Sequence, residues 1–134
     1  MIVWIDTARY AEAQPLFGLA PLDRIARTLR RLKQAPVRVI VSGPATPPEL
    51  PNGFERSPAT GDAAARLLAA LADTEDTTPV LALDAATVVD PRLVRHLGED
   101  DPNPHALRIA LSGEAEERGG LVRLTAADAE RLPA

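Results

Sequence analysis

Residues 21–43 have the sequence PLDRIARTLRRLKQAPVRVIVSG, in which a helical pattern is followed directly by the pattern of a strand. Between Leu22 and Leu32, apolar side chains recur at helical spacing with arginines between them, which predicts an amphipathic helix. Pro36 ends that helix. The segment at residues 37–41 is rich in β-branched residues and is predicted to be a buried strand. The stretch is therefore predicted to be a helix followed at once by a buried strand.

The same alternation continues on both sides of this stretch. Residues 1–5 and 79–84 are two further apolar runs that are predicted to be buried strands. A second helix is predicted from about Asp62 to Ala72, with Ala64, Leu67, Leu68 and Leu71 on one face. Asp90-Pro91 starts a third helix, because Asp suits the N-cap and Pro suits the first turn. The remaining predicted elements are strands at 107–111 and 121–124 and a short last helix opened by Thr125 and Asp128.

Strands that alternate with helices in this way predict a three-layer α/β/α domain with a mainly parallel sheet. We expect residues 1–134 to form a single domain of this kind. Right-handed crossovers place the strand at 1–5 between those at 37–41 and 80–83. Residues 43–53 contain several prolines and are predicted to be a loop.

Composition excludes several classes of function. The chain has no cysteine, which excludes disulfides, thiolate metal sites and cysteine nucleophiles. Its net charge is −4 and it has no basic block, so nucleic acid is not an expected partner. No apolar run reaches the ~18 residues that a membrane span needs. Residues 1–5 do not resemble a signal peptide, and we expect a cytoplasmic protein without a transmembrane segment.

Four segments, in order, resemble motifs of the nucleotidyltransferases. They are QPLFGLAPLDRIARTLRRL at 14–32, VRVIVSG at 37–43, TGDAAARLLAAL at 60–71 and PVLALDAATVVDPRLVRHL at 79–97. The group they resemble comprises the molybdenum-cofactor guanylyltransferases and the sugar- and inositol-phosphate cytidylyltransferases. The resemblance implies a Rossmann-like, nucleotide-diphospho-sugar-transferase-like fold, reduced in size.

The chain departs from that group at three motifs that carry the chemistry. The loop at 7–13 has no glycine, although the group places a glycine-rich loop there so that backbone N–H groups can approach a triphosphate. Gln14 stands where the group has a lysine, and Ala86 stands where it has a metal-binding aspartate. Each such contact typically contributes ~10²–10³-fold to the rate. We therefore assign no catalytic residue and no metal ligand.

The ends of the parallel strands form one rim of the sheet, where ligands bind in folds of this kind. The candidate nucleotide-binding residues on this rim are Asp6, Arg9, Ser42, Thr60, Gly61, Asp84 and Thr87. Plainer interpretations stay open: the aspartates as caps of backbone N–H groups, Arg9 as a solvated side chain, and Thr60-Gly61 as a helix-capping turn. With Arg9 as its single cation, the rim should hold a triphosphate only if Mg²⁺ bridges it to the two carboxylates. No other cofactor is expected.

The resemblance implies a degenerate nucleotidyltransferase-like domain that binds or regulates. Domains of this kind accompany CDP-alcohol phosphatidyltransferases, which are membrane-embedded enzymes of phospholipid headgroup synthesis. A nucleotide or a polyol phosphate and such a membrane enzyme are therefore the expected partners. Two alternatives stay open: an active nucleotidyltransferase that acts on a sugar or polyol phosphate with Arg9 and Asp84, and a protein-interaction module without a ligand.

Overall fold

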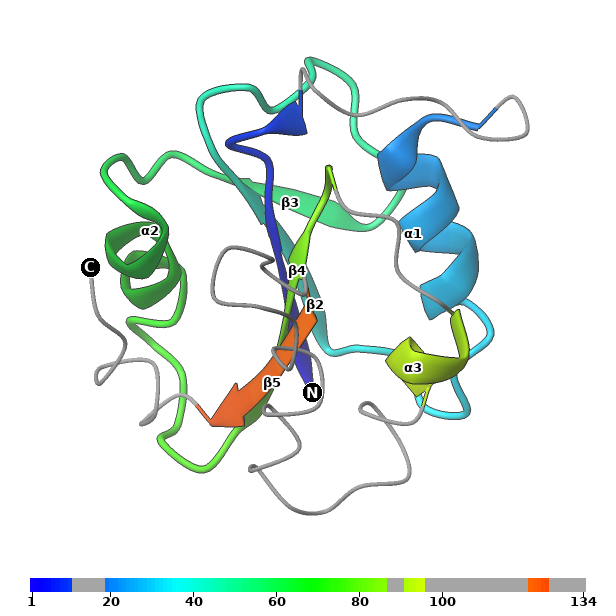
Figure 1. Ribbon diagram of the computed structural model, residues 1–134. Helices are drawn as coiled ribbons and strands as arrows, with labels where there is room; N and C mark the ends of the chain where they lie inside the picture. Colours follow the sequence, from blue (N-terminus) through cyan, green and yellow to red (C-terminus); the bar gives the residue numbers. More distant parts are fainter. Residues whose placement is uncertain (11–18, 87–90, 96–120, 126–134) are drawn as a thin grey trace, which may run out of the picture.

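The computed structural model describes residues 1–10, 19–86, 91–95 and 121–125, and it is built around one five-stranded sheet (Figure 1). The strand order is β3-β2-β1-β4-β5. Strands β1 to β4 are parallel and β5 is antiparallel to β4. The strands are β1 (Ile2–Asp6), β2 (Arg38–Ser42), β3 (Phe54–Ser57), β4 (Pro79–Asp84) and β5 (Leu121–Thr125).

The central position of β1 confirms the order that the sequence predicts. Ile2 lies between Arg38 of β2 and Val80 of β4, and the register continues without a bulge to the end of the strand. All of Ile2–Ile5 is buried, which explains why the run is apolar on both faces.

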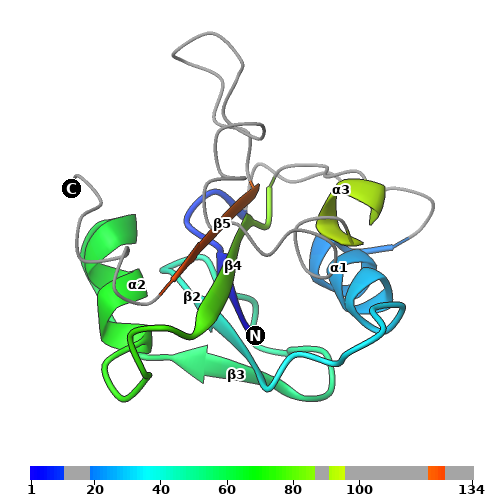
Figure 2. The same cartoon turned by 90° about the horizontal axis from the view of Figure 1, so that it is seen from below.

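Helices cover both faces of the sheet, as Figures 1 and 2 show. α1 (Pro21–Leu29) and α3 (Pro91–Arg95) lie on one face, and α2 (Ala63–Ala70) lies on the other. Two separate core clusters match this division. Leu22, Leu29 and Val94 pack with the first face, and Leu67 and Leu71 with the second. The predicted three-layer α/β/α architecture is confirmed.

Element boundaries differ from the predicted ones by a few residues. α1 starts with Pro21 at its first position, where the missing N–H costs nothing, and it ends at Leu29 rather than at Leu32. β2 begins at Arg38, so the predicted start at Val37 is wrong by one residue. Val37 is 79% exposed and does not belong to the buried part of the strand. The strand predicted at 121–124 is present as β5.

Two elements, the strand β3 and the helix α2, differ from the sequence prediction. The strand β3 has the sequence FERS, and it falls just after the predicted loop at 43–53. It is short, polar and half to fully exposed, as edge strands often are, so it carries no apolar pattern. On α2, the predicted apolar face is wrong at Leu68, which is exposed, and Arg66 is buried instead.

The predicted strand at 107–111 and the last helix after Thr125 lie outside the described residues. Within the part of the chain that the structure describes, no helix is long and apolar enough to cross a membrane.

Candidate functional site

One row of polar residues crosses the sheet where the parallel strands end. Asp84 of β4 is the register partner of Asp6 of β1, and Asp6 is also the partner of Ser42 of β2. Ser42 in turn pairs with Ser57 of β3. The structure therefore brings the predicted residues Asp6, Ser42 and Asp84 together and adds Ser57, which sequence analysis missed because it missed β3.

Asp6 makes two hydrogen bonds through its Oδ1 atom. The backbone N–H of Ala8 donates one at 2.9 Å, which closes a tight turn after β1. The guanidinium of Arg66 donates the other, also at 2.9 Å. The plainer interpretation of Asp6 as a strand-end cap is thus present in the structure, together with a buried ion pair that the sequence did not suggest.

Asp84 repeats this arrangement with a different arginine. Its Oδ1 accepts from the backbone N–H of Ala86 at 2.9 Å, and its Oδ2 accepts from Arg9 Nε at 3.1 Å. Arg9 Nη2 completes an ion pair with the same oxygen. The Arg9 side chain is 46% exposed and that of Asp84 only 16%. Arg9 is therefore engaged with a carboxylate rather than extended into solvent.

Arg66 is the main functional-site residue that the sequence analysis missed. It is 3% exposed, and besides Asp6 it donates to the carbonyl oxygens of Ser42 at 2.8 Å and Gly61 at 3.1 Å. Its guanidinium carbon lies 5.8 Å from the centre of the Trp4 ring. An arginine in the Ala- and Leu-rich segment 63–71 gives no sequence signal for burial, because its acceptors come from three other segments.

The turn after β2 is packed too tightly to admit a side chain. The carbonyl of Ser42 also accepts from the N–H of Thr7 at 2.9 Å and from Thr7 Oγ1 at 3.0 Å. Gly43 has a φ of 144°, and a Cβ there would lie 2.6 Å from Thr7 Oγ1. Ser42 itself is fully buried, and its Oγ has no hydrogen-bond partner among the described residues. Its hydroxyl therefore lies beneath the rim and not on it.

A pocket of about 330 Å³ lies beside this turn. Thr60 and Gly61 line it, as do Arg56 and Ser57 from β3. The volume is at the low end of what small-molecule sites occupy. Two of the predicted binding residues thus border a real cavity. Thr87 lies outside the described residues.

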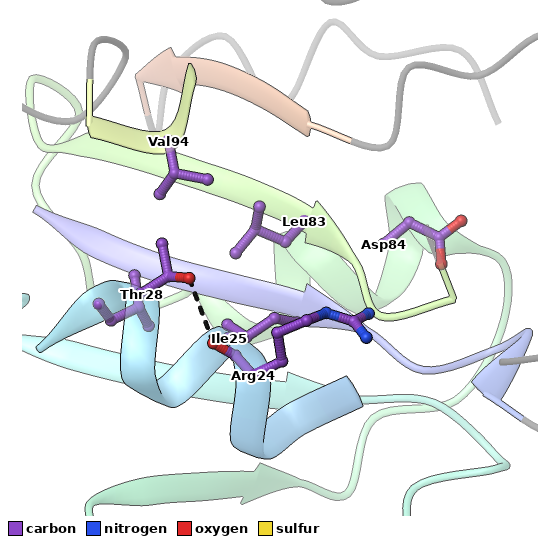
Figure 3. Close-up of a pocket in the computed structure, with 7 residues that line it drawn as sticks. Arg24, Ile25, Thr28, Leu83, Asp84 and Val94 are labelled. Carbon is purple, nitrogen blue, oxygen red and sulfur yellow. Dashed lines mark hydrogen bonds between the residues drawn. The ribbon is translucent and has the colours of Figure 1, made fainter. Parts of the chain in front are cut away.

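The space between α1 and β4 is much smaller. Arg24, Ile25, Thr28, Leu83, Asp84 and Val94 surround it (Figure 3), and its volume of about 20 Å³ is enough for about one water molecule. Arg24 extends toward the strand ends, and the Asp84 carboxylate points away from it (Figure 3). Arg24 Nη1 is buried without a hydrogen-bond partner among the described residues. No nucleotide fits in this space.

Tyr10 follows the turn that carries Arg9. Burial raises the pKa of the Tyr10 phenol above its ordinary value of 10.0, and the Asp23 carboxylate raises that pKa further. A backbone hydrogen bond with Leu22 lowers the pKa and partly offsets these effects. The loop after β1 is thus packed against the start of α1.

Arginine side chains engage both carboxylates of the rim. Mg²⁺ prefers oxygen ligands in octahedral geometry. Asp84 is held by Arg9 and Asp6 by Arg66, while Ala86 offers no oxygen from its side chain. In the described ranges, no three His, Asp or Glu side chains gather in one place. The prediction of a single cation at the rim is wrong, because Arg66 and Arg56 lie there too.

Comparison with known proteins gives a match by structure alone. No family model matches the chain, and no curated protein matches it in sequence. A solved structure of 4-diphosphocytidyl-2C-methyl-D-erythritol synthase is similar, with a TM-score of 0.53 and 18% identity. The match covers 76% of this chain and 54% of that protein, so the chain spans about half its length. The chain therefore shares the α/β fold of that synthase, which is of the nucleotide-diphospho-sugar-transferase type, in a smaller form.

Proposed function

We propose that this chain is a nucleotidyltransferase-like domain that binds a nucleotide or a polyol phosphate without transferring a nucleotidyl group. The observation that carries the proposal is the ion pair between Arg9 and Asp84. Asp84 is the carboxylate nearest to the position where the resembled enzymes hold their metal, and here its Oδ2 accepts from an internal guanidinium. The arginine neutralises the carboxylate that a metal ion would otherwise need as a ligand.

The three departures in sequence point in the same direction. The loop at 7–13 lacks glycine, Gln14 replaces a lysine and Ala86 replaces an aspartate. The retained parts are those that shape a cavity: the turn at Gly43, the segment Thr60-Gly61 and the first turn of α2, capped by Asp62. Loss of the charge-handling groups with retention of a cavity supports binding rather than catalysis.

The biological setting of the proposal is phospholipid headgroup synthesis in the cytoplasm. It rests on the resemblance to domains that accompany CDP-alcohol phosphatidyltransferases. Its test is the activity of such a membrane enzyme from the same source, assayed in detergent with and without this chain. A regulatory partner should change the enzyme's rate several-fold at saturating concentration, and an unchanged rate would remove this part of the proposal.

Ligand binding is tested most directly by thermal unfolding with CTP, CMP, GTP and glycerol 3-phosphate, each with and without Mg²⁺. A ligand at 100 times its dissociation constant adds ~2.7 kcal/mol to the free energy of unfolding. For a domain of this size that is a rise in Tm on the order of 10 °C. If no ligand raises the Tm, the chain is better described as an interaction module. If CTP with Mg²⁺ raises it and pyrophosphate is released, the chain is an active enzyme.

A further inference from the structure

The pocket beside Gly43 is positively charged, although the neighbouring strand ends carry two aspartates. Its lining includes two arginines, Arg56 and Arg66, and no carboxylate. The other polar side chains of the lining are the hydroxyls of Thr46, Ser57 and Thr60. All five of these side chains carry hydrogen-bond donors. Of the three hydroxyls, only that of Thr46 already donates its hydrogen to a described residue, to the carbonyl oxygen of Gly43 at 2.7 Å. The lining thus offers donors and positive charge, which is the chemistry that recognises an oxyanion.

Arg66 supplies a fixed donor at the inner wall of this pocket. Its Nε and Nη1 atoms are used by Gly61, Asp6 and Ser42. Among the described residues no acceptor is bonded to its Nη2, although the side chain is almost fully buried and lines the cavity. The ion pair and the Trp4 ring hold the guanidinium in place. Little conformational entropy is lost when such a group meets a ligand.

Arg56 supplies the net charge at the outer wall. Its Nη2 donates to the carbonyl oxygens of Pro47 and Pro48, the latter at 3.2 Å. These bonds hold the exposed side chain across the loop that borders the pocket. Nε and Nη1 make no hydrogen bond with the described residues, and no described carboxylate pairs with Arg56. Asp6 offsets the charge of Arg66, so the pocket keeps about one positive charge from Arg56.

We propose that this pocket binds a phosphomonoester, with the phosphate between Arg56 and Arg66 Nη2. The inference rests on the proposed function and names its ligand class. A phosphate has three terminal oxygens and so can accept from both guanidinium groups and from the Ser57 and Thr60 hydroxyls, whereas a carboxylate has two oxygens. The cationic side chains supply the neutralising charge, so binding needs no divalent cation.

The test is a calorimetric and NMR titration of the whole chain at constant ionic strength in the presence of EDTA. The probes are inorganic phosphate, glycerol 3-phosphate, CMP and cytidine. The variants are Arg56→Gln and, as a matched control, Arg38→Gln. Arg38 is an exposed arginine of the adjacent strand that pairs with Glu55 and does not line this pocket.

Glycerol 3-phosphate and CMP should bind the wild type in EDTA and shift the amide signals of Gly43, Thr60 and Gly61. Arg56→Gln should weaken both by about 10-fold or more, since a hydrogen bond to a charged group is lost. Arg38→Gln should change them less than about 2-fold. Cytidine should bind at least about 10-fold more weakly than CMP, because it lacks the phosphate.

Other outcomes separate this inference from the proposed function. If glycerol 3-phosphate binds through Arg56 and CMP does not, the pocket is confirmed and nucleotide binding fails. If CMP binds equally well to the wild type and Arg56→Gln, the chain binds a nucleotide, but the assignment of its phosphate to this pocket is wrong. Cytidine binding as tight as that of CMP, or binding that disappears in EDTA, would also overturn the phosphate assignment.

Discussion

Asp6 and Arg66 lie 60 positions apart in the chain and meet through a 2.9 Å hydrogen bond between Asp6 Oδ1 and Arg66 Nη1. The bond joins the end of the central strand β1 to α2, on the face of the sheet that carries Trp4. The arginine side chain is only 4% exposed, so water does little to stabilise its charge. This one carboxylate and two backbone carbonyls stabilise it instead.

Replacing Asp6 with alanine should strongly destabilise the protein. The change leaves the buried Arg66 guanidinium without its counter-ion, and breaking a buried pair in this way costs about 3 kcal/mol. Urea unfolding followed by circular dichroism measures the loss. The matched control is Glu55→Ala, which removes the carboxylate of the exposed Arg38–Glu55 pair and should cost less than about 1 kcal/mol. Equal losses in the two variants would contradict a structural role for the Asp6–Arg66 pair.

Replacing Gly43 with alanine should also destabilise the protein, for a steric reason. The new Cβ would lie 2.6 Å from Thr7 Oγ1 and 2.9 Å from the backbone nitrogen of Ala8. We expect a loss of about 2–3 kcal/mol, against about 1 kcal/mol for Gly53→Ala. Gly53 also has a positive φ, but no atom lies within 4 Å of its added Cβ, so it separates backbone strain from the clash. A Gly43→Ala variant as stable as Gly53→Ala would show that the turn after β2 can relax.

The central part of this architecture is predictable from sequence because it rests on local patterns. The segments that form β1, β2 and β4 each contain a stretch of consecutive apolar residues, and parallel pairing with right-handed crossovers then fixes their order. β3 cannot be predicted in this way, because FERS has no apolar pattern and its strand conformation depends on pairing with β2.

The site is predictable only in part, for the same physical reason. Asp6, Ser42 and Asp84 follow from the rule that strand ends share one rim. Arg66 does not, because two of its three acceptors, Asp6 and Ser42, come from strands that lie far away in the sequence. The partner of Arg9 is likewise 75 positions away, so the sequence offers no local sign that the arginine is engaged.

The Tyr10 phenol should titrate above pH 10.0, because burial and then the Asp23 carboxylate raise its pKa. The chain has one tyrosine, so the ultraviolet absorbance of phenolate reports Tyr10 alone. Asp23→Asn should lower the pKa toward 10.0 without reaching it, since burial remains the larger cause. Asp73→Asn serves as the control that removes an exposed carboxylate elsewhere.

The same shift has a consequence for stability, whose sign follows from linkage. The unfolded chain ionises Tyr10 near pH 10.0 and the folded chain ionises it only at a higher pH. The contribution of neutral Tyr10 is therefore complete below pH 10 and is lost as the pH rises through the folded-state pKa. Tyr10→Phe should reduce this alkaline loss of stability in urea unfolding. An unchanged pH dependence in that variant would contradict the assignment.

Nucleotidyl transfer from CTP or GTP to a sugar or polyol phosphate should not be measurable. Arg9 engages Asp84, and Gln14 and Ala86 remove two charged groups that the resembled enzymes use. A coupled pyrophosphate assay with Mg²⁺ measures the rate. Release near ~1 s⁻¹, within the ordinary range of enzymes, that is lost in Asp84→Ala would refute the proposed loss of catalysis.

The central position of β1 has a consequence for how the chain is made. β1 is synthesised before both of its neighbours, β2 and β4, and β4 ends only at Asp84. At about 5–20 residues per second, the ribosome needs on the order of ten seconds to complete the second neighbour. During that interval the apolar run Ile2–Ile5 lacks at least one of its two partner strands. The nascent chain is then most exposed to edge-to-edge association, and a ribosome-bound chaperone would protect it at that stage.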